Sequence, residues 1–345
     1  MRVLVAANLT PFLRGGAQEH IRGLTQALRD AGHSVECLEL PFVFNPYADV
    51  FRAMRWASEL DMSSPSGQSI DRLIGLQFPA YGVRHPNMIG WVMHQHRAVY
   101  DLYKESNRDS DLAQLRDEVH AFDMKTLKPL AESNRLFANS NRVAERLRVF
   151  NGLRARPLHH PPPMATHFFC KQPKPYIFYP SRFESLKRQN LVIEAMLHVG
   201  ASLQLVLAGD GGQFEASKAL ASRLELNNQV HFLGRISQSE KIAWMANSLA
   251  VAYPPLDEDY GYVTLEAMLS EKPVITCHDS GGPLEFVRHE KTGLIVSAEP
   301  KAMAEAFNAL AANPQRSIDM GKAAREHYQQ LRITWSGVVE QLLSA

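Results

Sequence analysis

Short apolar runs alternate with amphipathic stretches twice along this chain, on either side of a segment dense in proline. Runs typical of buried strands lie at 3–7, 34–40, 73–76, 88–93 and 136–138, and again at 176–179, 203–208, 230–233, 249–253, 274–276 and 294–296. Helical periodicity lies at 17–31, 188–199, 212–224 and 239–246. Strands that alternate with helices predict doubly wound parallel sheets. The segment 156–175 contains six prolines, which cannot continue a helix or a sheet, so we interpret it as the linker between two α/β domains.

Length, charge and cysteine content exclude several classes of protein. A chain of 345 residues is long for one core and fits two domains. Its net charge of +1 lacks the basic surplus of a nucleic-acid-binding protein. Three scattered cysteines predict neither a disulfide framework nor a zinc site, and they favour a reducing, cytoplasmic compartment. No apolar run is long enough to span a bilayer, and residues 1–7 are interpreted as a first strand rather than a signal peptide.

Two glutamates with seven residues between them dominate the second half, in the stretch Glu258-Asp-Tyr-Gly-Tyr-Val-Thr-Leu-Glu266. An apolar run precedes the stretch and a helical pattern follows it, so Glu258 is predicted on a loop after a strand and Glu266 in the next helix. The start of that helix presents unpaired N–H groups, which suit an anion such as a diphosphate. Carboxylates repel phosphates but accept hydrogen bonds from sugar hydroxyls. The combination therefore indicates a nucleotide-sugar site; the alternative is two solvated acids at a helix start.

This stretch resembles the paired-glutamate motif Glu-x-Phe/Tyr-Gly-x-x-x-x-Glu of family 4 retaining nucleotide-sugar glycosyltransferases, the glycosyl transferases group 1. Every fixed position is filled, although Val263 stands where the family often has proline. The resemblance implies the GT-B fold, with two Rossmann-like doubly wound parallel-sheet domains facing across a cleft. It predicts an acceptor-side domain at 1–160, a nucleotide-sugar-binding domain at 161–328, and a C-terminal helix at 329–345 that crosses back to the first domain.

Three further segments of the second domain support a nucleotide site. Ser181-Arg-Phe-Glu-Ser-Leu-Lys187 resembles the family's Gly-Arg-x-x-x-x-Lys segment, in which Arg182 and Lys187 would stabilise the departing diphosphate; the alternative is a basic loop without a ligand. Gly209 opens a glycine-rich turn that, by resemblance, helps to shape the nucleotide pocket. A nicotinamide site is disfavoured because Phe214 interrupts the dinucleotide fingerprint. By resemblance, the backbone at Arg235 and Ile236 reads the edge of the base.

In the first domain, Gly15 and Gly16 end a loop after the first strand, and by resemblance this loop lies opposite the diphosphate. His94 follows the strand 88–93 and would position the transferred sugar, with His96 in reserve. The His-x-His spacing could also bind a metal, but no third ligand is evident and the fold class usually works without one. The amides of Gly16, Gly261, Tyr262 and Val263 would complete the phosphate cradle.

These features predict an enzyme that moves a sugar from a nucleoside-diphosphate sugar, with UDP or GDP favoured, to a hydroxyl of a glycan, glycolipid or small molecule, and the resemblance implies that it retains the anomeric configuration. Glu266 would hold the ribose and Glu258 the transferred sugar. By analogy the biology is assembly of cell-surface polysaccharide or lipopolysaccharide. No cofactor or metal is required. Two alternatives stay open: a catalytically silent GT-B scaffold that binds a nucleotide sugar and a protein partner, and a nucleotide-sugar epimerase or phosphorylase.

An arginine-rich segment raises the question of membrane contact. Residues 135–156 carry six arginines and one acid, Glu145, and such a surplus could touch anionic lipid headgroups at the inner face of the membrane. A solvated helix face is the commoner explanation, and we favour it. The segment from Phe42 to Ser69 suggests no mechanism.

Overall fold

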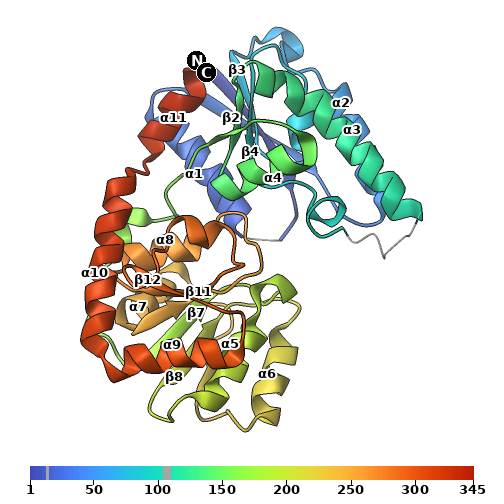
Figure 1. Ribbon diagram of the computed structural model, residues 1–345. Coiled ribbons are helices and arrows are strands. Elements are labelled where there is room, and N and C mark those ends of the chain that lie inside the picture. Colours follow the sequence, from blue (N-terminus) through green and yellow to red (C-terminus); the bar gives the residue numbers. More distant parts are fainter. Residues whose placement is uncertain (13–14, 104–109) are drawn as a thin grey trace. The chain divides into compact units, whose positions relative to one another are not determined.

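The computed structural model describes residues 1–12, 15–103 and 110–345, which form two compact units (Figure 1). Unit 1 consists of Met1–Pro163 and Thr334–Ala345, and unit 2 of Met164–Ile333.

Unit 1 is built on a six-stranded parallel sheet with the order β2-β1-β3-β4-β5-β6. The strands are β1 (Arg2–Leu9), β2 (Ser34–Pro41), β3 (Arg72–Gly75), β4 (Met88–Val92), β5 (Leu136–Ala138) and β6 (Arg156–Pro157). In β1 the residues from Val3 to Ala7 are all buried, as expected for a parallel strand covered on both faces. The alternation of strands and helices therefore predicted this sheet correctly.

Helices cover both faces of the unit 1 sheet, and each face has its own apolar core. The helices are α1 (Gly16–Asp30), α2 (Tyr47–Glu59), α3 (Ser110–Glu132), α4 (Asn141–Asn151) and α11 (Trp335–Leu343). Neighbouring strand residues such as Leu73 and Ile74 belong to opposite cores, because side chains alternate along a strand. One core includes residues of α2, α3 and α4, and the other includes residues of α1 and α11.

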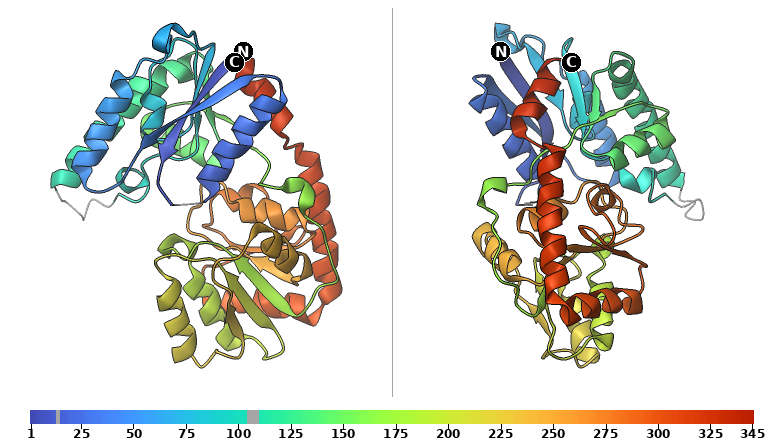
Figure 2. Two further views of the ribbon diagram at one scale, coloured as in Figure 1. Left: turned by 180° about the vertical axis from the view of Figure 1, so that it is seen from behind. Right: turned by 60° about the vertical axis from the view of Figure 1, so that its left-hand side comes forward.

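Helix α11, which comes after the whole of unit 2 in the sequence, packs beside α1 (Figure 2). Val338 and Leu342 are buried in the same core as Leu24 and Leu28. Gly23 makes this approach possible, since a Cβ atom there would lie 2.2 Å from the ring of Trp335. Unit 1 is therefore completed by a segment far from its other residues in the chain.

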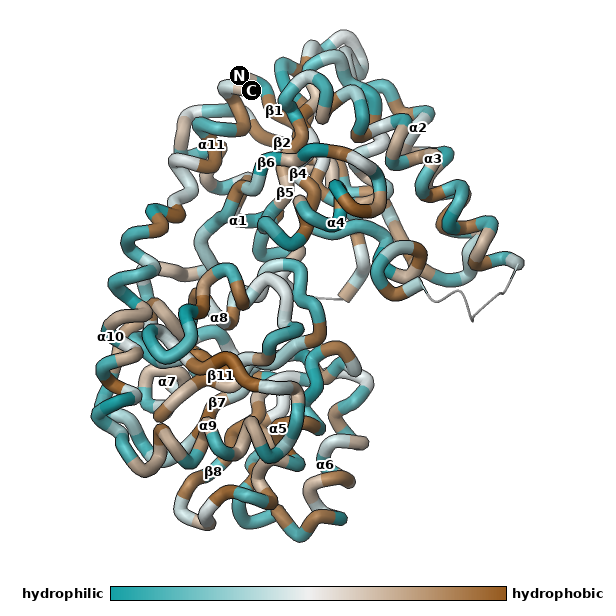
Figure 3. The backbone as a smooth tube through the Cα atoms, in the orientation of Figure 1, coloured by the Kyte–Doolittle hydropathy of each residue, from teal (hydrophilic) through white to brown (hydrophobic). Residues whose placement is uncertain are grey.

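Unit 2 repeats the plan with the strand order β12-β11-β10-β7-β8-β9, again parallel. Its strands are β7 (Tyr176–Pro180), β8 (Gln204–Ala208), β9 (Val230–Phe232), β10 (Ala250–Ala252), β11 (Val274–Cys277) and β12 (Gly293–Val296). Its helices are α5 (Gln189–Ala195), α6 (Phe214–Arg223), α7 (Gln238–Asn247), α8 (Tyr262–Leu269), α9 (Pro300–Ala312) and α10 (Pro314–Leu331). The most hydrophobic stretches of this unit include its central strands (Figure 3).

Two details differ from the sequence prediction. The proline-rich segment 156–175 does enter a sheet, because Arg156 and Pro157 pair with β5 as the edge strand β6. Proline is compatible with an edge strand, where its missing N–H leaves no ladder bond unmade. The helix predicted at 188–199 is regular only over α5, and residues Met196–His198 tighten into a 3-10 turn.

Candidate functional site

Two loops of unit 2 meet the condition that open parallel sheets set for a ligand site. The strand order reverses between β7 and β10, and ligands bind outside the carboxyl ends of the strands at such a reversal. We call residues 181–188 after β7 and 253–261 after β10 the switch-point loops. Lys187 lies on the first loop, and its Nζ donates a hydrogen bond to Oε2 of Glu258 on the second. The structure thus joins two of the predicted catalytic residues in an ion pair.

The hydroxyl groups of two tyrosines contact Lys187 of this ion pair. The hydroxyl of Tyr253 lies 3.4 Å from Nζ of Lys187, and the hydroxyl of Tyr179 donates to the Lys187 carbonyl. Burial, reinforced by the charge of Glu258, raises the pKa of Tyr253 well above its usual value. Its hydroxyl therefore stays neutral and can donate a hydrogen bond to the carboxylate or to a ligand.

Glu266 lies in α8 with a side chain that is only 1% exposed. Its Oε1 accepts a hydrogen bond from Nζ of Lys241 at 2.5 Å. Its Oε2 is buried and accepts no hydrogen bond from any residue that the structure describes. Buried carboxylate oxygens in native proteins nearly always have hydrogen-bond partners, so this oxygen is a candidate acceptor for a donor group of a ligand or a water molecule.

Lys241 was missed in the sequence analysis. The local signal is a capping box, in which Ser237 and Glu240 exchange hydrogen bonds at the start of α7 and so place Lys241 one turn into the helix. Nothing local, however, connects a lysine in α7 to a glutamate 25 positions later. That pairing depends on the tertiary fold.

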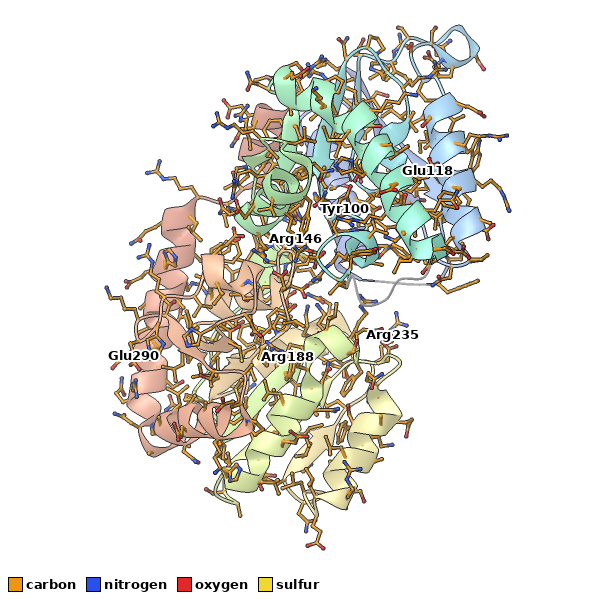
Figure 4. All side chains as sticks on the ribbon, turned by 45° about the vertical axis from the view of Figure 1, so that its right-hand side comes forward. Tyr100, Glu118, Arg146, Arg188, Arg235 and Glu290 are labelled. Atoms are coloured by element: carbon orange, nitrogen blue, oxygen red, sulfur yellow. The ribbon has the colours of Figure 1, made fainter. Side chains whose placement is uncertain are left out.

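The loop that carries Glu258 is fixed by neighbours in the loops after β7 and β11. Backbone hydrogen bonds join Glu258 to Ser280 and Gly282 in the loop after β11. Arg188, which was also missed, donates to the carbonyls of Pro254 and Pro255 and forms two hydrogen bonds of 2.8 Å with Asp279. Figure 4 labels Arg188 within unit 2. Its guanidinium thus ties the loop after β7 to the loops after β10 and β11.

Gly209 brings the glycine-rich turn after β8 against the first switch-point loop. Its φ of +138° is rare for residues with a side chain, and a Cβ atom there would lie 2.0 Å from the carbonyl oxygen of Ser181. Phe183 then donates its N–H to the carbonyl of Asp210 at 2.7 Å. The backbone of Arg182 is therefore held between these contacts.

Replacing Gly209 by alanine is expected to lower the free energy of unfolding of unit 2 by about 2–4 kcal/mol, because both the dihedral angle and the contact with Ser181 become unfavourable. Urea unfolding measures this change. Gly200→Ala is the matched control, since a Cβ atom at Gly200 meets no atom within 4 Å. Equal stabilities of the two variants would contradict the argument.

The remaining predicted residues of unit 2 lie at the start of α8 and in the loops after β7 and β9. Gly261 is the N-cap of α8, and Tyr262 and Val263 form its first turn, where amides lack intrahelical acceptors. Arg182 is half exposed, and its ion-pair partner is Glu184 at 4.0 Å rather than either site glutamate. Arg235 is exposed at the loop before α7 (Figure 4), whereas Ile236 packs partly against the core.

In unit 1, Gly15 is the N-cap of α1 and Gly16 begins the helix. The amide of Gly15 already donates to the side chain of Gln18 at 3.0 Å. Leu13 and Arg14 of the same loop lie outside the described residues.

The two candidate histidines have different surroundings. Strand β4 ends at Val92, so the strand does not continue far enough to place both on one face. His96 is buried, with its ring centroid 5.2 Å from that of Phe44 and 5.4 Å from that of Phe78, and burial lowers its pKa to about 4. His94 is only partly buried, and its Nδ1 lies 3.1 Å from the carbonyl of Gln95. His94 is therefore the more accessible of the two.

A buried polar network supports the segment that follows His94. Asp123 in α3 accepts hydrogen bonds of 2.6 Å from Tyr81 and 2.7 Å from Tyr100, and Asn151 links Tyr100 to Gln95. Complete burial raises the pKa of Asp123 to about 7, although the two tyrosine donors act in the opposite direction. This network was not predicted from the sequence, because its members come from four separate segments.

We expect Asp123→Asn to remove a pH dependence of stability. Because the folded pKa of about 7 lies above the unfolded value, the protonated carboxyl stabilises the fold below about pH 4, and this contribution is lost as the pH rises through 7. The wild type should lose about 2–4 kcal/mol over this range relative to the variant. Urea unfolding at pH 4, 5.5 and 7 measures the difference in the free energy of unfolding between the wild type and the variant. Other titrating groups contribute equally to both proteins and cancel in this difference. A difference that does not change with pH would refute the prediction.

The arginine-rich segment is only partly a surface feature. Arg146 in α4 is buried, 2% exposed, with Nη2 3.9 Å from Asp101, and Arg156 lies over the ring of Phe137 at 4.7 Å. Arg148 pairs with Glu145. The interpretation of the segment as one solvated face is therefore wrong for Arg146, and the charge available to a lipid surface is smaller than the sequence suggested.

The described residues contain neither a helix that could span a membrane nor a cluster of metal-binding side chains. Helices there are too short or too polar to cross a bilayer. Within those ranges no cluster of three or more histidine, cysteine, aspartate or glutamate side chains could bind a metal ion.

The segment 42–69 contains α2 and borders a groove of about 440 Å³ in unit 1. The groove is lined by Pro41, Phe42, Val43, Asp49, Arg52, Ala53, Arg55, Trp56 and Glu59.

The second half of the chain is similar in sequence to a known protein family. Residues 168–327 match the family described as glycosyl transferases group 1. The human alpha-1,3/1,6-mannosyltransferase ALG2 is 29% identical over 166 residues, which are 44% of this chain and 40% of that protein. The chain thus spans less than half the length of this curated relative.

Solved structures extend the similarity to the whole chain. Sucrose-phosphate synthase from Thermosynechococcus elongatus has a TM-score of 0.79 at 19% identity, with 100% of this chain and 98% of that chain covered. Anabaena HepE in complex with UDP and glucose has a TM-score of 0.73 at 17% identity, with complete coverage of both chains. These similarities confirm the predicted GT-B class, with two Rossmann-like parallel-sheet units.

Proposed function

We propose that the chain is a retaining glycosyltransferase, because residues 168–327 match the family described as glycosyl transferases group 1. It would move a sugar from a nucleoside-diphosphate sugar to a hydroxyl of a glycan, glycolipid or small molecule. A hexose such as mannose is the first candidate, because human ALG2 is named as a mannosyltransferase. UDP and GDP are the first bases to test, and UDP is bound in the Anabaena neighbour.

One observation carries the proposal: a buried glutamate with an unused oxygen lies in the helix that starts at the second switch-point loop. Glu266 Oε2 is a buried acceptor without a partner among the described residues, and α8 begins at Tyr262, directly after its N-cap Gly261. We assign the ribose hydroxyls to Glu266 and the diphosphate to Lys187, Arg182 and the amides of the first turn of α8. Gly209, Arg235 and Ile236 would shape the base pocket.

In the proposed reaction the bond between the anomeric carbon and the diphosphate oxygen breaks, and its electron pair stays on the diphosphate. The acceptor hydroxyl oxygen bonds to the same face of that carbon and passes its proton to the leaving phosphate. Lys187 and Arg182 would stabilise the growing negative charge. Glu258, released from Lys187, would accept hydrogen bonds from the transferred sugar. His94 of unit 1 remains the candidate for a further contact with that sugar, and Gly15 and Gly16 for contact with the phosphates.

Calorimetry with UDP, GDP, ADP, dTDP and CMP tests donor recognition, and sugar transfer followed by NMR of the product tests catalysis and retention. The proposal expects one diphosphate to bind clearly and the product to keep the donor's anomeric configuration. Binding without turnover on any acceptor would favour a silent scaffold. Donor consumption without an acceptor would favour an epimerase, and dependence on free phosphate would favour a phosphorylase.

The biological setting is the broadest part of the proposal. Assembly of cell-surface polysaccharide or lipopolysaccharide on the cytoplasmic face of a membrane fits an enzyme of this class by analogy. Comparing a soluble oligosaccharide acceptor with the same glycan on a lipid in vesicles tests it. Equal rates on both would argue against a membrane site of action.

A further inference from the structure

We propose that Lys241 is a positioning residue for nucleotide recognition, which orients the Glu266 carboxylate so that Oε2 faces a ribose hydroxyl and couples that carboxylate to the loop beside the base. This inference rests on the proposed function, since it assumes that a ribonucleotide is the ligand. None of the family features that identify the site includes Lys241.

Glu266 carries a carboxylate in a buried position. A carboxylate that is 1% exposed loses nearly all of its hydration, and such a group needs a cation or several hydrogen bonds to stay ionised. Among the described residues the only hydrogen-bond donor to this carboxylate is Nζ of Lys241, 2.5 Å from Oε1. Lys187, the other ammonium group of the site, is paired with Glu258 instead. Each glutamate therefore has its own lysine.

The geometry of the contact leaves one oxygen available. Lys241 bonds to Oε1 alone, and Oε2 has no partner in the part of the chain that the structure describes. The backbone of Glu266 is fixed within α8, where its carbonyl accepts from Ser270, so the side-chain torsions are the remaining freedom. The bond to Lys241 restrains those torsions. The ion pair thus selects which oxygen of Glu266 a ligand meets.

Lys241 also connects Glu266 to the loop proposed to read the base. Helix α7 begins at Gln238, and the residues directly before it are Arg235, Ile236 and the N-cap Ser237. The amide of Lys241 donates to the carbonyl of Ser237 at 3.0 Å, and the Ser237–Glu240 capping box closes the same turn. A shift of this loop therefore moves the anchor of the Lys241 side chain. Recognition of base and ribose would be coupled through one lysine.

The chemistry predicts a specific discrimination. An ionised oxygen without a partner binds a hydroxyl strongly, whereas a nucleotide without that hydroxyl leaves it buried and unsatisfied. A hydrogen bond to a charged group corresponds to about a 10- to 100-fold change in affinity. The wild type should therefore prefer a ribonucleoside diphosphate over its 2′,3′-dideoxy form by at least this factor.

The test compares UDP and GDP with their 2′,3′-dideoxy forms by calorimetry. Lys241→Met keeps the length of the side chain but removes the cation, and the preference for the ribonucleotide should fall to within about threefold. Lys241→Arg restores a cation and should recover most of the preference. Lys218→Met in α6, which removes the partner of Glu215 at 3.7 Å, is the matched control and should leave the preference unchanged.

A double-mutant cycle separates positioning from general damage to the fold. In a Glu266→Gln background, Lys241→Met should change the preference no further, because no charged carboxylate remains to be oriented. An undiminished preference in Lys241→Met would overturn the inference while leaving the proposed function intact. Failure of the wild type to bind any nucleoside diphosphate would instead overturn the proposed function, and the inference with it. A Lys241→Met protein that does not fold is replaced in the cycle by Lys241→Gln.

Discussion

Replacing Glu266 by alanine is expected to raise the dissociation constant of the nucleoside diphosphate about 10- to 100-fold. The ribose hydroxyl that faces Oε2 would lose a hydrogen bond to a charged acceptor, and such a bond contributes about 1.5–3 kcal/mol. The substitution also leaves the ammonium of Lys241 without its partner at 2.5 Å. Calorimetric titration measures the effect directly, in the same experiment that identifies the base.

Glu215→Ala is the matched control for this substitution, because Glu215 is an exposed residue of α6 whose partner is Lys218 in the same helix. Its affinity should equal that of the wild type. Circular dichroism and thermal unfolding confirm that Glu266→Ala still folds. A dissociation constant within threefold of the wild type, in a folded protein, would remove Glu266 from the nucleotide site and with it the observation on which the proposed function depends.

Replacing Lys187 by methionine is expected to lower kcat for sugar transfer about a hundred- to a thousandfold, with a smaller change in nucleotide affinity. Negative charge on the diphosphate grows as the bond to the sugar breaks, so a cation there stabilises the transition state more than the ground state. Removal of one preorganised charge-stabilising group typically costs a factor of this size. The substitution also leaves Glu258 without its ion-pair partner.

Steady-state rates and calorimetry together distinguish the two parts of this prediction. Lys174→Met, at an exposed position before β7, is the control and should keep the full rate. A second variant, Lys187→Arg, retains a cation and should lose less activity than the methionine variant. A kcat within fivefold of the wild type for Lys187→Met would show that leaving-group stabilisation lies elsewhere.

The fold could be predicted from the sequence because its signals are local. A buried parallel strand such as β1 or β10 appears in the sequence as a short apolar run, whichever strands lie beside it in the sheet. The edge strand at Arg156 and Pro157 was missed because its signal is not local. Whether a proline-containing segment lies at an edge strand or in a linker depends on a partner strand, here β5, that is distant in the sequence.

The site was predictable as far as its residues follow strand ends. Lys187 and Glu258 were both assigned to loops at the carboxyl ends of strands, and the structure brings them into contact. Lys241 and Arg188 were not recognised, because each acts through a partner 25 or more positions away. A lysine or an arginine near a helix start is usually solvated. Only the fold shows that Lys241 binds a buried carboxylate and that Arg188 binds two neighbouring loops.

The packing of α11 against α1 has a consequence for how the protein is made. A ribosome releases residues 1–163 first, but the core around Leu24 and Trp91 lacks Val338 and Leu342 until about 170 further residues have been added. At 5–20 residues per second this interval lasts roughly 10–35 seconds. Throughout it the part of α1 that contacts α11 is uncovered, while unit 2 completes its own sheet once β12 ends at Val296. The segment translated in the middle can therefore reach its native state before the one translated first.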